Sequence, residues 1–125
     1  MNNSVITISG NLVSDAKPGL TSSNVPFTKL RVASTERKRS PQGSWEDGET
    51  TYIDVVCWRR LSEGASTLKK GQRVIAFGRL RANNWTKADG TKVYDYEIDA
   101  DDVASSVFFT KKEGSDLSAL GNESW

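Results

Sequence analysis

A period-two alternation of side chains runs through most of the chain and constrains its fold more than any other feature. The alternation, together with β-branched and aromatic residues, is clearest in residues 4–13, 27–35, 50–60 and 73–85. Strands that place one face against a core and the other toward solvent show this pattern. The sequence therefore predicts an all-β domain built from these four strands and a fifth over residues 93–100.

The segments between the predicted strands carry turn and helix signals. Residues 17–26 are rich in turn formers, and residues 36–49 are predicted to be a long, mobile loop. Residues 61–72 contain the one predicted helix, of one to two turns, and an Asp-Gly pair within residues 87–92 marks a hairpin tip. One short helix between the third and fourth of five strands is the order of the oligonucleotide/oligosaccharide-binding (OB) fold, a partly open five-stranded barrel.

Length and composition limit the class of protein. At 125 residues the chain is long enough for one domain with its own core. No apolar run approaches the roughly 18 residues that a membrane span needs, and no signal peptide is visible. The single cysteine, Cys57, fits a reducing compartment. These features predict a cytoplasmic protein without a membrane partner.

The net charge of +1 conceals an uneven distribution of charge. Residues 28–92 hold 14 Lys and Arg against 7 Asp and Glu, whereas residues 101–125 hold 2 against 5. A basic middle favours a body that binds a polyanion. The alternative is that these charges are scattered over a solvated surface.

Alternation also places aromatic side chains on strand faces that carry basic ones. The aromatic residues are Tyr52, Trp58 and Trp85, and the basic residues are Lys29, Arg31, Arg79 and Arg81. Flat rings stack on unstacked bases of any sequence, and cations neutralise the phosphates between them. The pattern predicts binding of single-stranded nucleic acid, with DNA and RNA both open. The alternative is that the rings cover a barrel end or lie in a subunit interface.

The residues needed for several other chemistries are missing from the sequence. The chain has no histidine and one cysteine, so it lacks the commonest general base and cannot assemble a structural zinc site alone. Cys57 lies on the inward face of its strand and is predicted to be a small buried apolar residue. Asp95, Glu97 and Asp99 alternate on one strand face, which favours a solvated face over a magnesium cluster. We expect no enzyme activity, metal or cofactor.

Four stretches of the chain resemble the bacterial-type single-stranded DNA-binding protein family, over roughly residues 3–104. They are "ITISGNLVSDA", "LRVAST", "TTYIDVVCWRRLSEGASTLKKGQRV" and "FGRLRANNWTKADGTKVYDYEI". The resemblance implies sequence-independent binding and protection of single-stranded DNA in replication, recombination and repair, and hence association with the nucleoid. It also implies a homotetramer, a dimer of dimers, in which Val5 to Leu12 of two subunits pair. The alternative is a primosome, competence or phage accessory protein that binds the strand weakly and bridges partners.

The resemblance assigns binding roles to individual positions. The stacking aromatics of the family fall on Tyr52, Trp58 and Trp85, but the position of a further aromatic is occupied by Lys38. Either Trp45 in the same loop takes its place, or phosphate contacts replace the lost stack. The full predicted phosphate-binding set is Lys29, Arg31, Arg37, Lys38, Arg39, Arg79, Arg81, Lys87 and Lys92.

The C-terminal region departs from the replicative members of the family. Residues 1–104 are predicted to be the OB domain, residues 105–112 an added intersubunit clamp strand of actinobacterial type, and residues 113–125 a flexible tail or its remnant. The chain ends in "LGNESW" rather than in an acidic stretch with a terminal Phe. That ending fits a truncation, a tail-less paralogue or a phage-type member, and puts the recruitment of replication and repair proteins in doubt.

Overall fold

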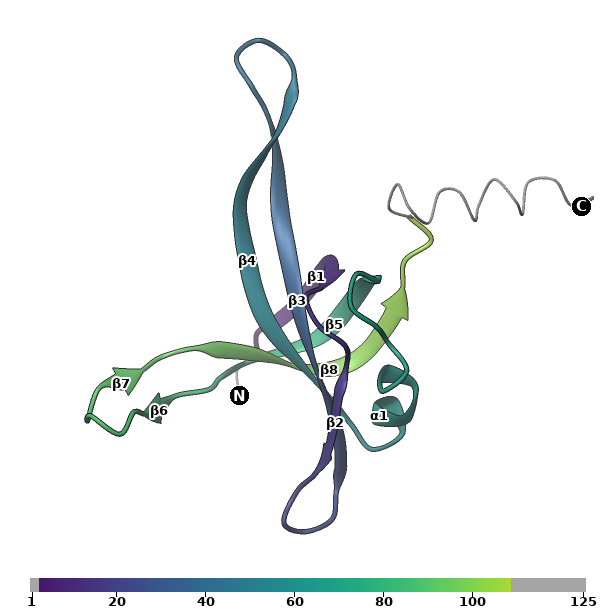
Figure 1. Ribbon diagram of the computed structural model, residues 1–125, viewed down its shortest axis with the longest axis vertical. Coiled ribbons are helices and arrows are strands. Elements are labelled where there is room, and N and C mark those ends of the chain that lie inside the picture. Colours follow the sequence, from purple (N-terminus) through teal and green to yellow (C-terminus); the bar gives the residue numbers. More distant parts are fainter. Residues whose placement is uncertain (1–2, 109–125) are drawn as a thin grey trace, which may run out of the picture.

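The fold is taken from a computed structural model of the chain, which describes residues 3–108. Eight strands and one helix follow one another along the chain (Figure 1). They are β1 (Val5–Leu12), β2 (Lys17–Leu20), β3 (Pro26–Arg39), β4 (Trp45–Trp58), α1 (Arg60–Ala65), β5 (Arg73–Ala82), β6 (Trp85–Thr86), β7 (Lys92–Val93) and β8 (Tyr96–Ser105).

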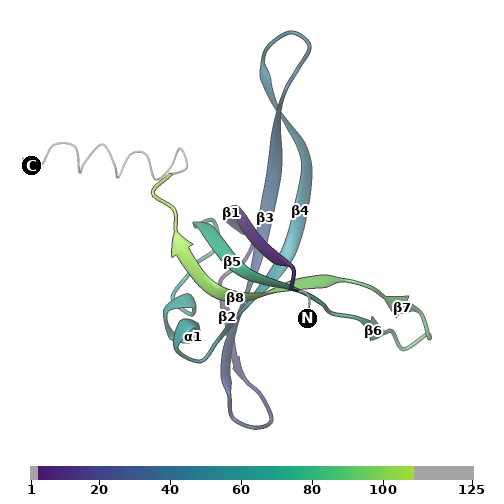
Figure 2. The same cartoon turned by 180° about the vertical axis from the view of Figure 1, so that it is seen from behind.

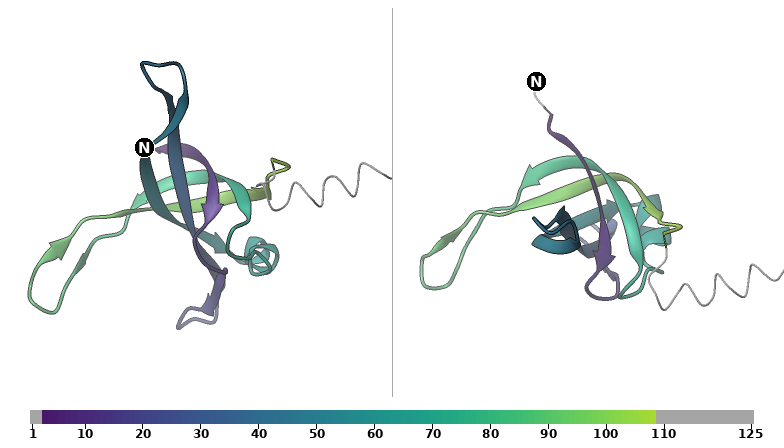
Figure 3. Two further views of the ribbon diagram at one scale, coloured as in Figure 1. Left: turned by 45° about the horizontal axis from the view of Figure 1, so that its top comes forward. Right: turned by 90° about the horizontal axis from the view of Figure 1, so that it is seen from above.

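Six of the strands form one curled sheet in the order β1-β5-β8-β4-β3-β2. All neighbours are antiparallel except β4 and β8, which run parallel through three residue pairs. β1 also reaches β3 through Asn11 and Leu12, so five strands wrap into a partly open barrel (Figures 2 and 3). The single helix lies between β4 and β5, as the sequence predicts, and the OB fold is confirmed.

The barrel is filled by one side of the alternating strands. Its buried side chains are Leu12, Leu30, Val32, Ile53, Val55, Cys57, Ala65, Val74, Ala76 and Ile98. In β4 the core takes Ile53, Val55 and Cys57, the set that alternation assigns to the inner face. Val56 belongs to the outer face by register but is also buried, between its cross-strand neighbours Lys29 and Asp99.

Two glycines allow the strands to approach closely where the sheet curls. A Cβ on Gly10 would collide with the carbonyl group of Ala33, at the point where β1 reaches β3. A Cβ on Gly78 would collide with the backbone of Asp99, next to an irregularity in the β5–β8 pairing. Both positions need the missing side chain rather than a left-handed backbone.

The prediction of a long, mobile loop over residues 36–49 is wrong. β3 and β4 continue their pairing outward, and the chain reverses only within residues 40–44, so a long two-stranded ribbon extends from the barrel (Figure 1). A hydrogen bond of 2.9 Å between the hydroxyls of Thr35 and Thr50 joins its strands near the base. Polar and charged cross-strand contacts hold this ribbon, so it has no apolar period to reveal it in the sequence.

Other boundaries also differ from the sequence prediction. Residues 17–20, predicted as part of a turn, form the edge strand β2, whose partner is the start of β3. The predicted fifth strand divides into the short β7 and the longer β8, which continues to Ser105. Of the predicted clamp strand over residues 105–112, residue 105 is the last residue of β8 and residues 106–108 are not in a strand. Residues 109–112 and the predicted tail lie outside the described residues.

Candidate nucleic-acid interface

The outward side chains of four neighbouring strands form one continuous surface, here called the central face. Directly paired residues point to the same side of a sheet, so the register defines its members. They are Phe27, Lys29 and Arg31 of β3, Tyr52, Asp54 and Trp58 of β4, Arg79 and Arg81 of β5, and Glu97 and Asp99 of β8. The structure therefore brings together two of the predicted stacking aromatics and four of the predicted phosphate-binding residues.

Two of the aromatic side chains on the central face have their own supporting contacts. The rings of Phe27 and Trp58 lie 5.6 Å apart at an interplanar angle of 51°, and Trp58 stays 39% exposed. The guanidinium carbon of Arg31 lies 5.8 Å from the centre of the Tyr52 ring. Each ring is thus held against a neighbour while part of it faces solvent, which suits a stacking platform.

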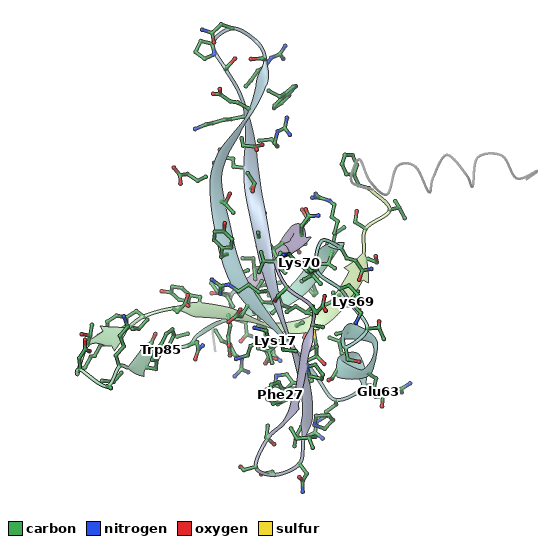
Figure 4. The ribbon with its side chains drawn as sticks, viewed as in Figure 1. Lys17, Phe27, Glu63, Lys69, Lys70 and Trp85 are labelled. Atoms are coloured by element: carbon green, nitrogen blue, oxygen red, sulfur yellow. The ribbon has the colours of Figure 1, made fainter. Side chains whose placement is uncertain are left out.

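Trp85 lies on a second ribbon, here called the β6–β7 arm, which comprises residues 83–95 and extends sideways from the barrel (Figures 1 and 4). The Trp85 side chain is 45% exposed. The backbone N–H of Thr91 donates to the Asp89 carboxylate over 2.9 Å at the tip, and this bond lowers the pKa of Asp89 below its ordinary value. The predicted cations Lys87 and Lys92 lie on either side of that turn.

Trp45 belongs to the other ribbon, here called the β3–β4 arm, which comprises residues 36–49. Its ring is 61% exposed and lies 5.9 Å from the guanidinium carbon of Arg39. With Arg37 and Arg73, Trp45 lines a cavity of about 630 Å³ between the arm and β1. The structure therefore groups Trp45 with Arg37 and Arg39, but not with the aromatics of the central face.

Every ion pair among residues 3–108 uses an arginine that the sequence predicts to bind phosphate. Arg31 pairs with Asp54 at 3.2 Å, and Arg37 pairs with Asp47 at 3.5 Å. Asp99 meets both Arg79 at 3.8 Å and Arg81 at 3.1 Å. The four predicted lysines, Lys29, Lys38, Lys87 and Lys92, take part in none of these pairs.

Sequence reasoning missed several residues of these surfaces. Phe27 supports Trp58, and its position two residues before Lys29 in an alternating strand could have placed it on the same face. Lys17 pairs with Lys29 across β2 and β3, and Figure 4 shows it close to Phe27. Tyr94, 72% exposed, is another exposed aromatic, at the end of the β6–β7 arm nearest the barrel. Tyr94 is identified by its exposure in the structure and not by a sequence pattern.

The inner face of the barrel offers little chemistry. Burial, with a smaller contribution from the Asp99 carboxylate, raises the pKa of the Cys57 thiol to about 12. Cys57 is therefore the buried thiol that the sequence predicts, protonated at neutral pH. No group of three or more His, Cys, Asp or Glu side chains within residues 3–108 could hold a metal ion. In the same residues, no helix is long and apolar enough to cross a bilayer.

The chain is similar to known proteins along most of its length. The model of the single-strand binding protein family matches residues 2–106. A single-stranded DNA-binding protein from Corynebacterium glutamicum is 38% identical over 110 residues, which are 86% of this chain and 49% of that protein. Single-stranded DNA-binding protein 2 from Streptomyces coelicolor is 40% identical over 105 residues, or 82% of this chain and 53% of the relative.

A solved structure agrees with the fold. The small single-stranded DNA-binding protein from Streptomyces coelicolor superposes with a TM-score of 0.75 at 28% identity, covering 86% of this chain and 97% of that one. The chain spans about half the length of the first two relatives. The family match over residues 2–106, the OB barrel and the basic, aromatic face agree with one another, and the chain belongs to the single-strand binding protein family.

Proposed function

We propose that the chain binds single-stranded DNA without regard to base sequence and shields it during replication, recombination and repair. The observation that carries this proposal is the central face, where Tyr52 and Trp58 stand beside Lys29 and Arg31 on neighbouring strands. Such a surface offers rings to the bases and cations to the phosphates, and neither interaction selects a particular base. The role is one of binding, without catalysis, metal or cofactor.

The bound DNA strand crosses the central face and continues onto the β6–β7 arm. Bases stack on Tyr52 and Trp58 on the barrel and on Trp85 on the arm, each stack contributing about 1–3 kcal/mol. Lysines that join none of the ion pairs of the described residues, such as Lys29 and Lys87, bind the phosphates between the stacked bases. If about five phosphates are neutralised, the logarithm of the binding constant falls with the logarithm of salt concentration at a slope near −3.5.

We further propose that the chain assembles as a homotetramer, a dimer of dimers. β1 pairs with β5 along one edge and meets β3 only at Asn11 and Leu12, so residues 5–10 leave the other edge of β1 unpaired among the described residues. An open edge of this kind accepts a second strand, and a second copy of β1 supplies it.

The outward face of β5 supports the second contact of the tetramer. Its first half exposes Ile75 and Phe77, whereas its second half exposes Arg79 and Arg81. Exposed apolar side chains side by side favour packing between two dimers, and the arginines of the same strand remain with the central face. We expect Phe77→Lys to convert tetramers to dimers in sedimentation velocity, and an unchanged sedimentation coefficient would contradict this arrangement.

The proposed cellular location follows from the binding of single-stranded DNA. A protein that coats single-stranded DNA works in the cytoplasm at the nucleoid, and we propose that location.

A titration of intrinsic tryptophan fluorescence tests the proposed function. Oligo(dT) of increasing length is added at 0.05 M and 0.3 M salt, and oligo(dC) and duplex DNA serve as comparison ligands. Strong quenching that saturates at a defined length, weakens with salt and is similar for the two single strands is expected. A folded protein whose fluorescence and anisotropy do not respond to any single strand would contradict the proposal.

A further inference from the structure

Carboxylates stand among the cations of the central face. Asp54 accepts a hydrogen bond of 3.2 Å from Arg31, and Asp99 lies within 3.8 Å of Arg79 and 3.1 Å of Arg81. Three arginines that would bind phosphates therefore already contact an anion of the same chain. The two acids come from neighbouring strands, because Asp54 pairs with Glu97 and Val56 pairs with Asp99.

A carboxylate and a phosphate bind an arginine side chain in the same way. Both present oxygens that accept parallel N–H bonds from the planar guanidinium group. An arginine that meets a phosphate must therefore leave Asp54 or Asp99, or share its donors with it. Because the arginines are 42–57% exposed, their ion pairs are screened by water and the exchange is easy.

The acids do not leave the face when the arginines change partner. The side chain of Asp99 is only 17% exposed, and that of Asp54 is 26% exposed, so both are fixed between neighbouring strands. Each remains close to the bound phosphates and repels them. The number of counterions released on binding is therefore smaller than the number of arginines on the face suggests.

We propose that Asp54 and Asp99 limit the affinity of the central face for single-stranded DNA. They occupy Arg31 and the pair Arg79 and Arg81 in the free protein, and they oppose the phosphates in the complex. A strand held in this way dissociates faster and is passed more readily to another protein. The inference rests on the proposed function, because it assumes that phosphates lie on this face.

The test replaces each acid by its isosteric amide, in Asp54→Asn and Asp99→Asn. Each variant should bind oligo(dT) roughly 5-fold more tightly at 0.1 M salt and steepen the salt slope by about 0.7, the effect of one more phosphate contact on a single strand. Stopped-flow competition with excess unlabelled oligo(dT) should show slower dissociation. Circular dichroism and thermal unfolding establish that each variant is folded.

A matched control separates a local effect from a general gain of positive charge. Glu63→Gln removes the same single charge from α1, where Figure 4 shows the side chain well apart from Trp85. Glu63 belongs to none of the ion pairs in the described residues. Glu63→Gln should leave both the affinity and the salt slope close to those of the unmodified protein.

The outcomes distinguish this inference from the proposed function. If the unmodified protein does not bind oligo(dT), the proposed function fails. If it binds but the folded variants bind equally well or more weakly, the acids orient the arginines or are inert, and only the inference is overturned. A gain as large for Glu63→Gln as for Asp54→Asn would also overturn it. Asp54→Asn keeps the test decisive if Asp99→Asn does not fold, since Asp54 is the more exposed of the two acids.

Discussion

The β3–β4 arm and the β6–β7 arm have similar composition but different internal contacts. Each is two-stranded, and each carries an exposed tryptophan and both signs of charge (Figure 1). In the β3–β4 arm, a carboxylate of one strand pairs with an arginine of the other, Asp47 with Arg37, and a second arginine lies over the tryptophan. In the β6–β7 arm, Asp89 and Asp95 accept backbone N–H bonds, and the lysines belong to none of the ion pairs within residues 3–108.

This difference indicates that a cation is available to a phosphate only where no carboxylate of the same chain pairs with it. Asp89 and Asp95 accept backbone bonds and pair with neither Lys87 nor Lys92, so these lysines remain available to a phosphate. Because Asp47 pairs with Arg37, contact between this arginine and a phosphate would release fewer counterions from the DNA. On the proposed function, we therefore expect the β6–β7 arm to bind the DNA, whereas Arg37 of the β3–β4 arm is neutralised by Asp47.

The largest expected effect separates the two tryptophans. Trp85→Ala removes a platform beside free cations and should weaken binding of oligo(dT) by about 5- to 150-fold, the range of one base stack. Trp45→Ala should cost less than about 5-fold, below that range. Fluorescence anisotropy with labelled oligo(dT) measures both. Equal losses would contradict the proposed difference, because they would show that the two arms bind oligo(dT) alike.

Charge substitutions give a smaller effect with the same direction. Lys87→Gln should reduce the magnitude of the salt slope by about 0.7 and weaken binding about 5-fold at 0.1 M salt. Arg37→Gln should reduce the slope by less than about 0.35, because Asp47 already neutralises Arg37 in the free protein. Titrations at four salt concentrations give these slopes. A larger change for Arg37→Gln than for Lys87→Gln would contradict the account.

The smallest change is expected in a double-mutant cycle that tests the coupling between Arg37 and Asp47. In an Asp47→Asn background, Arg37 has lost its ion-pair partner and becomes available to a phosphate. Arg37→Gln should then cost more than it does with Asp47 present, and the slope change should approach about 0.7. An identical cost in both backgrounds would mean that Asp47 does not control the arm.

Much of the fold follows from local patterns. Alternation separates Ile53, Val55 and Cys57 from Tyr52 and Trp58 correctly, because only one face of that strand meets the core. The helix and the hairpin tip also carry local signals. The β3–β4 arm was missed because cross-strand partners such as Arg37 and Asp47 are known only once the register is known.

The candidate site follows from the sequence in part. Lys29, Arg31, Arg79 and Arg81 share one face as predicted, since alternation fixes the side to which each points. Their carboxylate partners were not predicted, because Asp54 and Asp99 come from strands far apart in sequence. The stacking and phosphate-binding roles of these residues stay predictions, as do the clamp strand over residues 105–112 and the tail.

Photo-crosslinking tests most directly the claim that the strand crosses the central face onto the β6–β7 arm. Oligo(dT) with single 5-iodouracil substitutions is irradiated with the protein, and mass spectrometry locates the adducts. We expect adducts at Trp58 and Trp85, with weaker ones at Phe27 or Tyr52. Adducts confined to the β3–β4 arm or to Ile75 and Phe77 would contradict this claim and would place the strand on a different surface.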